Sequence, residues 1–462
     1  MEVSMSVRLR PRLEWLGVAL ALVLSTWSSP AQAFCGFFVG KADATLFNNA
    51  SQVVVVHDEG KTVLTMVNNY RGEPKAFALV VPVPVVLQKG LVRVTEMKAI
   101  DQLDGFSAPR LAEYYDPDPC QVMRMRNKMA PSAAGAAPAM EMERKADKKT
   151  GVTVEASYTV GEYDIVILSA TESDGLETWL RQNQYNIPKG AAGALKPYVT
   201  SGMKFFVAKV NIKEQQKAGF TTLRPLQFAF PDKRFMLPIR LGMLNADGPQ
   251  DLIAYVITKQ FRVETANYVN PRLPSDVEVP TYIKGEFKSF YRSMFGNQVA
   301  KENGRAVFTE YAWNMAWCDP CAADPLSNEQ LQQLGVWWVR GQGGQGGAQQ
   351  AFVTRLHAQY TPQTFPEDLM LKVTKDSSNY QARYVLRHPF TGAARCEAFK
   401  GYKEQVLARR EKESQTLANL TSWRVDDIRR RQLPLPAAFG SSDNSNPEDD
   451  GWNQQMQDMF KQ

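Results

Sequence analysis

Two cysteines, Cys318 and Cys321, are the side chains of this chain whose chemistry is easiest to name. They lie in the stretch WCDPC, where a tryptophan precedes the first cysteine and a proline precedes the second. Two thiols at this spacing can close into a disulfide and exchange it with another thiol when one of them is held as a thiolate. The motif therefore indicates either a thiol–disulfide oxidoreductase centre or part of a structural disulfide.

The residues that follow this motif favour the structural interpretation. Pro325 lies where a helix begun at Cys318 would continue, and an interior proline removes a backbone hydrogen bond. A helix start is predicted instead at Ser327, because Ser327 and Gln330 form a capping-box pattern. Both cysteines would then lie in a loop, away from the helix dipole that could acidify a thiol.

All five cysteines of the chain are disulfide candidates: Cys35, Cys120, Cys318, Cys321 and Cys396. An odd number allows two bridges and leaves one thiol over. We predict that Cys318 or Cys321 bridges to Cys396, at the start of a C-terminal helix. The alternative is a Cys318–Cys321 bridge, which would serve redox exchange.

The N-terminal residues have the order of a secretory signal peptide. Three arginines precede an apolar run at Leu16–Leu24, and Ala31-Gln32-Ala33 forms an A-x-A cleavage site. We expect cleavage after Ala33 by the general export machinery. Because Phe34 directly precedes Cys35, a lipid anchor on that cysteine is not expected. The mature protein is predicted to reside in the periplasm or outside the cell, where disulfides form.

Composition and charge exclude several other classes. The longest later apolar run, Phe77–Leu87, is too short to cross a bilayer, so no transmembrane segment is expected in the mature chain. The formal charge is +6, of which residues 1–33 hold +1, and the remainder forms no basic stripe interleaved with aromatics. Nucleic acid is therefore not an expected partner. Neither a G-x-S-x-G elbow nor a phosphate-binding loop occurs.

The pattern of short Val-rich segments and turns predicts a mainly β, overall α+β fold. We expect two antiparallel β-sandwich-like units and an α+β C-terminal region with a long amphipathic helix. The predicted segments are a signal peptide (1–33), an N-terminal β domain (34–170) with a disordered excursion (127–151), a second β-rich domain (171–285), an α+β region (286–432) and a disordered acidic tail (433–462).

Specific elements follow from local signals. Asp58-Glu59-Gly60-Lys61 is a hairpin turn between two apolar runs. Residues 336–339 and 352–360 are expected to be the strands of a long hairpin. Residues 397–432 are expected to form one helix, whose buried stripe has four members: Val406, Leu417, Leu420 and Ile428.

Two histidines, His357 and His388, are candidates for a metal site. They lie in segments predicted to be neighbouring strands, and pairing of those strands would bring the imidazoles together or near Cys396. A zinc ion could then be shared with Cys318 and Cys321. The plainer interpretation is that both histidines are satisfied by backbone groups at strand ends, and no cofactor is predicted.

Several longer stretches resemble one bacterial family. They include FALVVPVP at 77–84, SAPRLAEYY at 107–115, VGEYDIVILSATESDGLETW at 160–179, FMLPIRLGMLNADGP at 235–249 and WCDPCAADPL at 317–326. The chain is similar in these stretches to the secreted family catalogued as domain of unknown function twenty-three thirty. The resemblance covers nearly all of the mature chain, and it implies export but no activity, ligand or catalytic residue.

These observations favour an exported soluble protein that is a non-catalytic binding or structural module. An envelope protein or an extracellular ligand is a conceivable partner. A thiol–disulfide oxidoreductase using Cys318 and Cys321 is the alternative, and a metal-binding module is the third. Whether the protein is an enzyme stays open at this point, and an exposed Cys318 would favour the redox function.

Overall fold

A computed structural model describes the chain in residues 37–41, 48–67, 77–120, 151–183, 185–186, 188, 190–211, 214, 223–317, 325–339, 350–392, 394, 396–432, 434–435 and 439. The predictions for the signal peptide and for most of the excursion and tail lie outside these residues. They therefore stay predictions.

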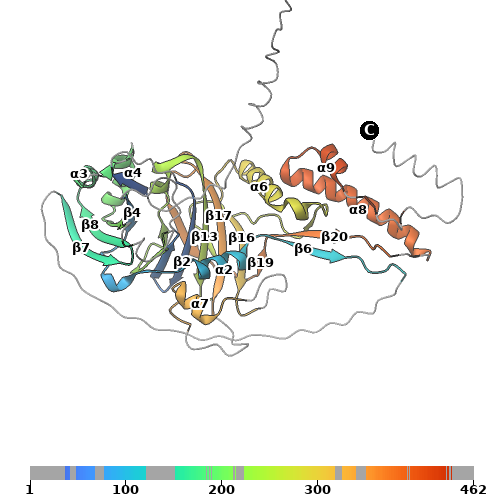
Figure 1. The fold of residues 1–462 in the computed structure, drawn as a ribbon, viewed down its shortest axis with the longest axis horizontal. Helices are drawn as coiled ribbons and strands as arrows, with labels where there is room; N and C mark the ends of the chain where they lie inside the picture. The colour runs from blue at the N-terminus through green and yellow to red at the C-terminus, as the bar shows by residue number, and fades with distance from the viewer. Residues whose placement is uncertain are drawn as a thin grey trace, which may run out of the picture. The chain divides into compact units, whose positions relative to one another are not determined.

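The Val-rich run of strand β2 (Asn48–Asp58) lies inside the largest sheet (Figure 1). Val53 and Val55 point into one hydrophobic core, whereas Val54 and Val56 point into another. Successive side chains of a strand face opposite sides of the sheet, so an unbroken apolar run is what a strand covered on both faces requires. Glu59 and Gly60 have φ of 47° and 72°, which closes the predicted tight turn to β3 (Lys61–Met66).

The eight-stranded sheet that contains β2 has the order β19-β16-β17-β13-β2-β3-β11-β5. Its other strands are β19 (Tyr380–Gln381), β16 (Phe308–Asn314), β17 (Phe352–Tyr360), β13 (Ala246–Thr258), β11 (Leu226–Pro231) and β5 (Val92–Val94). All pairs in this sheet are antiparallel except β13 with β2.

A six-stranded antiparallel sheet packs against one face of the larger sheet. Its order is β7-β8-β10-β4-β1-β9, with bounds Val152–Val160, Tyr163–Ala170, Lys204–Val210, Phe77–Val83, Phe37–Lys41 and Tyr185–Asn186. Leu79 and Ile167 from this sheet share one core with Val53 and Leu64 from the larger sheet. The two sheets therefore form a single sheet-on-sheet core.

Helices cover the outer faces of both sheets. The six-stranded sheet is covered by α3 (Ser173–Gln182) and α4 (Ala191–Thr200), and the eight-stranded sheet by α2 (Met97–Ser107) and α7 (Asn328–Gln333). Short 3-10 turns occur at η1 (Lys89–Leu91) and η2 (Arg240–Asn245), and a small sheet has the order β12 (Met236–Leu237), β18 (Leu369–Val373), β14 (Val263–Thr265).

The C-terminal layer combines a parallel three-stranded sheet with three helices. The strands are β15 (Val277–Glu278), β20 (Arg383–His388) and β6 (Arg110–Tyr115), and the helices are α6 (Ile283–Lys301), α8 (Ala398–Thr421) and α9 (Val425–Arg431). Phe290 of α6, Tyr384 of β20 and Leu417 of α8 belong to one buried cluster. None of the helices in the described residues is long and apolar enough to cross a membrane.

Most of the local sequence signals are confirmed. The fold is mixed α+β, and Ser327 forms the predicted capping box with Gln330. The four predicted buried residues of the C-terminal helix, Val406, Leu417, Leu420 and Ile428, are all buried. The strands of the two expected sandwich-like units are shared between the two sheets, and the domain boundaries themselves stay a prediction.

Parallel pairing joins strands of different predicted segments in β6–β20, β15–β20 and β13–β2. Two expectations are corrected. Residues 336–339 are not a strand, since Val336 and Val339 pack instead into the core beneath the large sheet. The single helix at 397–432 is two helices, because Ser422 adopts a left-handed conformation (φ 60°) that ends α8.

A disulfide joins Cys120, beyond the end of β6, to Cys396, just before α8, across a sequence separation of 276 residues. The prediction that Cys396 bridges to Cys318 or Cys321 is therefore wrong. The parallel pairing of β6 with β20 carries the segments that follow both strands in the same direction, and this brings the two cysteines together.

We expect Cys120→Ser and Cys396→Ser each to lower the free energy of unfolding by about 3 kcal/mol, because each opens the same long loop in the unfolded chain. Denaturant unfolding of the oxidised protein measures this loss. The double variant should lose no more than either single variant, since one interaction is removed in all three. Losses that add up would contradict the bridge.

Candidate functional site

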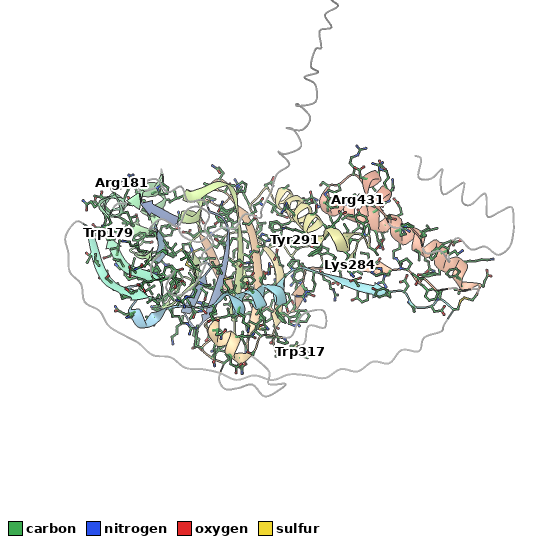
Figure 2. The ribbon with its side chains drawn as sticks, viewed as in Figure 1. Trp179, Arg181, Lys284, Tyr291, Trp317 and Arg431 are labelled. Atoms are coloured by element: carbon green, nitrogen blue, oxygen red, sulfur yellow. A yellow bond between two sulfur atoms is a disulfide. The ribbon has the colours of Figure 1, made fainter. Side chains whose placement is uncertain are left out.

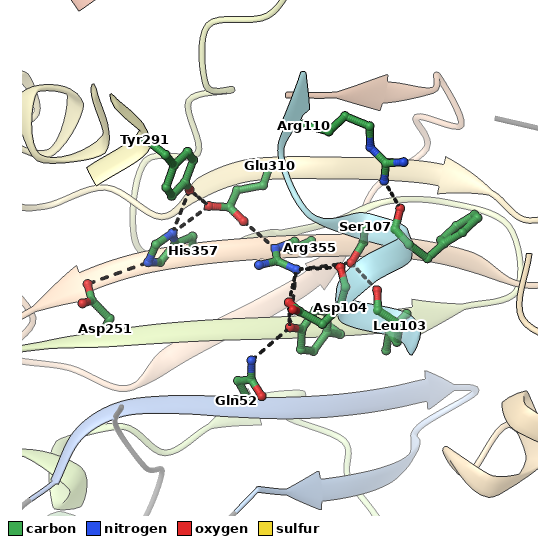
Figure 3. Close-up of polar contacts among 12 residues, drawn as sticks. Gln52, Leu103, Asp104, Ser107, Arg110, Asp251, Tyr291, Glu310, Arg355 and His357 are labelled. Carbon is green, nitrogen blue, oxygen red and sulfur yellow. Dashed lines mark hydrogen bonds and ion pairs between the residues drawn. The ribbon is translucent and has the colours of Figure 1, made fainter. Parts of the chain in front are cut away.

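A buried polar cluster lies between the eight-stranded sheet and helices α2 and α6 (Figure 3). Arg355 and His357 are two residues apart in β17, so they share one face of the sheet. In the neighbouring β16, Thr309 pairs with Leu356 and Tyr311 with Arg355, which leaves Glu310 as the extra residue of a bulge. Ionisable side chains of both strands thus meet beneath the helices.

Glu310 is the centre of this cluster and has no exposed surface. Its Oε1 lies 2.6 Å from Nδ1 of His357, and its Oε2 accepts a hydrogen bond from Nε of Arg355 at 2.5 Å. The hydroxyl of Tyr291 in α6 also donates to Oε1. Three donors therefore surround one carboxylate, which is the arrangement that a buried charge requires.

Arg355 extends the cluster to helix α2. Its Nη1 donates to Oδ1 of Asp104 at 2.5 Å, and the hydroxyl of Tyr255 donates to the same oxygen at 2.5 Å. The guanidinium lies over the Tyr255 ring, 5.1 Å from its centroid. One arginine thus connects β16, β17, β13 and α2 by charge-assisted hydrogen bonds and a cation–π contact.

The charges in the cluster shift the proton equilibria of its members. Burial alone would raise the pKa of Glu310, but the charges of His357 and Arg355 and the hydrogen bonds to Glu310 lower it to about 2. Burial alone would lower the pKa of His357, but Glu310 and Asp251 raise it to about 9. Near neutral pH the carboxylate is therefore ionised and the imidazole is protonated.

This cluster has the residue types of an acid–base centre, but its geometry is that of a structural link. Glu310 is wholly buried, and His357 is 7% exposed with its ring stacked on Phe295 at a centroid distance of 3.8 Å. The second imidazole nitrogen lies 3.7 Å from Oδ1 of Asp251. The ionised groups are occupied by one another rather than directed at open space.

The two histidine strands do not pair, so the condition for a shared metal site is not met. His357 lies in β17 of the eight-stranded sheet, whereas His388 ends β20 of the C-terminal layer, where it lies 3.0 Å from Oε2 of Glu113. Cys396 is bonded to Cys120 and joins neither histidine. Within the described residues, no group of three or more His, Cys, Asp or Glu side chains could hold a metal ion.

A cleft of about 440 Å³ opens between the ends of β6 and β20 and helix α8. We call it the basic cleft, and its ionisable lining residues are Asp116, Arg387, His388, Arg409, Arg410 and Glu413. Tyr115, Pro280, Pro389 and Phe390 contribute apolar surface. Cys120 lies four residues after Asp116, and Cys396 lies six residues after Phe390. The disulfide between these cysteines therefore connects the chain segments that follow β6 and β20, both of which contribute residues to the cleft.

The three arginines of the basic cleft have different partners. Arg387 donates to Glu278 at 2.7 Å, and Arg409 donates to Asp116 at 2.8 Å. Arg410 donates from Nε to Gln432, a neutral side chain, at 2.7 Å. Burial lowers the pKa of Arg410, and the charge of Glu413 partly offsets this effect. Arg410 thus lies within electrostatic reach of a carboxyl group that is itself buried.

A second cleft, of about 480 Å³, lies beside η1, β11 and α7. Its polar lining is already engaged: Arg93 donates to Gln227 at 2.6 Å and to the carbonyls of Gln332 and Gln333 at 3.0 and 3.1 Å. These contacts satisfy the carbonyl end of α7. The basic cleft is therefore the better candidate for recognition of a polar ligand.

Cys318 and Cys321 lie outside the described residues. Trp317, which precedes them, is described and is 45% exposed (Figure 2). Of the candidate cysteines, only Cys120 and Cys396 are placed, and they are bonded to each other. The predicted structural role of Cys318 and Cys321 therefore loses Cys396 as the partner that it required.

Neither the buried cluster nor the basic cleft was identified from the sequence. The available signal for the cluster was the pair Arg355 and His357 at strand spacing within a segment of mostly apolar residues, together with Glu310 in the preceding strand. The signal for the cleft was weaker, because Arg409 and Arg410 lie in a helix rich in charges. Only the position of β20 distinguishes them from a solvated helix face.

Comparison with protein-family models finds one match, over residues 29–372, to a family described as an uncharacterised protein conserved in bacteria, DUF2330. No curated protein and no solved structure matches the chain. The matched residues contain Glu310, Arg355 and His357, whereas all three arginines of the basic cleft follow residue 372.

We expect the buried cluster to stabilise the protein most between pH 4.5 and 6.5, the ordinary pKa values of Glu and His. The folded pKa of Glu310 is depressed, so its contribution is lost as pH falls from 4.5 towards about 2. The folded pKa of His357 is raised, so its contribution is lost as pH rises from 6.5 through about 9. Denaturant unfolding across this range measures both losses.

Glu310→Gln tests the same cluster at fixed pH. The amide removes the carboxylate that Arg355 and His357 share inside the protein, so we expect a loss of about 3 kcal/mol and a weaker acid dependence. Glu404→Gln, on an exposed part of α8, is the matched control and should change little. An unchanged stability of Glu310→Gln would show that the carboxylate is not ionised in the folded protein.

Proposed function

The chain belongs to the bacterial family DUF2330, whose description names no activity, so we propose a function from the geometry of the structure. We propose that the protein is an exported, non-catalytic binding protein that holds a small anionic ligand in the basic cleft. The observation that carries this proposal is the convergence of Arg387, Arg409 and Arg410 on one cavity. Guanidinium groups are the preferred partners of carboxylate and phosphate oxygens.

The charge of the basic cleft supports an anion rather than a cation. Three arginines, Arg387, Arg409 and Arg410, line the cleft, whereas only two acidic side chains, Asp116 and Glu413, are among the described lining residues. An anion placed among these guanidinium groups is attracted to them, and the attraction is strongest in a site partly removed from water.

The size and walls of the basic cleft support a small molecule. A volume of about 440 Å³ falls in the range that pockets for small ligands occupy. Pro280, Pro389, Phe390 and the exposed ring of Tyr115 provide apolar surface next to the charged groups. Ligand sites typically combine such apolar walls with a few polar groups that fix orientation. Export would place this site in contact with extracellular or periplasmic solutes.

A second candidate function is thiol–disulfide exchange by Cys318 and Cys321. One observation favours it: Cys396 is bonded to Cys120, so the structural bridge predicted for this pair has lost its partner. A disulfide between Cys318 and Cys321 would constrain little of the chain and would serve mainly in exchange.

Benzoate, a carboxylate on a flat apolar ring, is the probe for this site, and we expect it to bind to the mature protein. Arg410→Gln should weaken this binding about tenfold, because a charge-assisted hydrogen bond to the carboxylate is lost. Isothermal titration calorimetry measures the dissociation constant. Arg430→Gln is the matched control, because Arg430 is exposed on α9 and pairs with Asp427. Benzamide, which has the same shape without the charge, should bind at least about tenfold more weakly. Absence of benzoate binding at about 10 mM would refute the proposed function.

The thiol–disulfide function is tested by the reduction of insulin with dithiothreitol. If Cys318 and Cys321 exchange disulfides, the wild-type protein accelerates insulin precipitation, and Cys318→Ser abolishes the acceleration because the attacking thiol is gone. Cys35→Ser, outside the motif, should retain it. A wild-type rate equal to that of dithiothreitol alone would exclude this second function.

A further inference from the structure

Glu413 is the least satisfied ionisable group of the basic cleft. It is 4% exposed, and it lines the cavity. Within the described part of the chain, its Oε1 and the Nε of Arg409 have no hydrogen-bond partner, although these two atoms lie 3.6 Å apart. A buried carboxylate with so few donors is costly, and a neutral carboxyl group that can itself donate is far less so.

Charged groups face Glu413 from several elements. Arg409 and Arg410 flank it on α8, Arg387 approaches from β20, and Glu278 from β15. Asp116, beyond β6, accepts from Arg409, and His388 at the end of β20 lines the same cavity. Three arginines thus share the carboxyl groups of Asp116, Glu278 and Glu413. The net charge of the cleft therefore depends on whether Glu413 is protonated.

The proton of Glu413 is exchangeable near neutral pH. Burial raises the pKa of Glu413 to about 7, Arg409 opposes this rise, and Glu278 adds to it through like-charge repulsion. Below this pH the group is a neutral acid with one O–H donor, and above it the group is an anion that only accepts.

Building on the proposed function, we propose that Glu413 determines ligand specificity in the basic cleft, and that the cleft takes up one carboxylate together with one proton. Neutral Glu413 donates its O–H to one oxygen of the ligand carboxylate, and a guanidinium of the cleft donates to the other. The proton comes from solvent and stays on Glu413, so no bond of the ligand is broken. Ionised Glu413 has no donor and repels the ligand.

The apolar walls extend this inference from the carboxylate to the rest of the ligand. Phe390 and Pro389 follow directly after His388, and the exposed ring of Tyr115 stacks on that histidine with centroids 4.6 Å apart. A flat or cyclic apolar body would cover these surfaces while its carboxylate reached the arginines. The ligand class is therefore a small ring-bearing carboxylate, for which benzoate is the probe.

The test is the pH dependence of benzoate binding to the mature protein by calorimetry. If only neutral Glu413 permits binding, the dissociation constant rises about tenfold between about pH 6 and about pH 8, because benzoate keeps its charge throughout. At the higher pH, binding should also take up close to one proton, which is measured from titrations in buffers of different ionisation enthalpy.

Two variants separate Glu413 from other titrating groups. Glu413→Gln retains a donor but cannot ionise, so it should bind at both pH values with nearly the same dissociation constant. Glu404→Gln, on the exposed side of the same helix, should keep the full tenfold ratio. His388→Gln, a change at another residue that lines the same cleft, is measured as well and should also keep most of this ratio.

The outcomes distinguish this inference from the proposed function. Tight benzoate binding with no pH dependence, or a pH dependence that persists in Glu413→Gln, would refute the role of Glu413 and leave the anion-binding function intact. Absence of benzoate binding at both pH values would refute the function itself. Should Glu413→Gln fail to fold, carbon-detected NMR of the Glu413 carboxyl in the wild-type protein replaces it. Benzoate must then raise the pKa of that carboxyl, and an unchanged value would overturn the inference.

Discussion

Glu310 is an ionised carboxylate without exposed surface, in a sheet that is covered on both faces. Removing such a charge from water costs several kcal/mol, and the cost is offset only if donors are held around it with good geometry. Here the donors are Arg355, His357 and Tyr291, which belong to β17 and α6. Arg355 in turn requires Asp104 of α2. One buried charge thus connects helices α2 and α6 to the central sheet, in addition to the hydrophobic packing of both helices.

The same dependence explains which features could be predicted from the sequence. Signals contained within a few residues were read correctly, such as the capping box at Ser327 and the tight turn at Gly60. The burial of Glu310 depends on a bulge and on partners that lie 45 and 47 residues away. The partner of Cys396 depends on the pairing of β6 with β20. Periodicity reports local structure and carries no information about such distant partners.

The buried cluster and the basic cleft also differ in their relation to the family. The residues of the cluster fall within the matched segment, 29–372, whereas Arg387, Arg409, Arg410 and Glu413 follow it. Tyr115, Asp116 and Pro280, which also line the cleft, lie within the matched segment. The proposed ligand site therefore combines residues of the matched segment with residues of β20 and α8 that follow it, and its arginines come from β20 and α8.

The parallel register of β6 with β20 has a consequence for the time course of folding. Arg110 is opposite Arg383, so β6 is synthesised some 270 residues before β20, the strand with which it pairs. Contacts of such long range are slow to form, because the chain between them must first be ordered. Until β20 has been synthesised, β6 has no partner strand on that edge. Unpaired edges are places at which chains associate wrongly, so β6 needs protection until the C-terminal part of the chain is available.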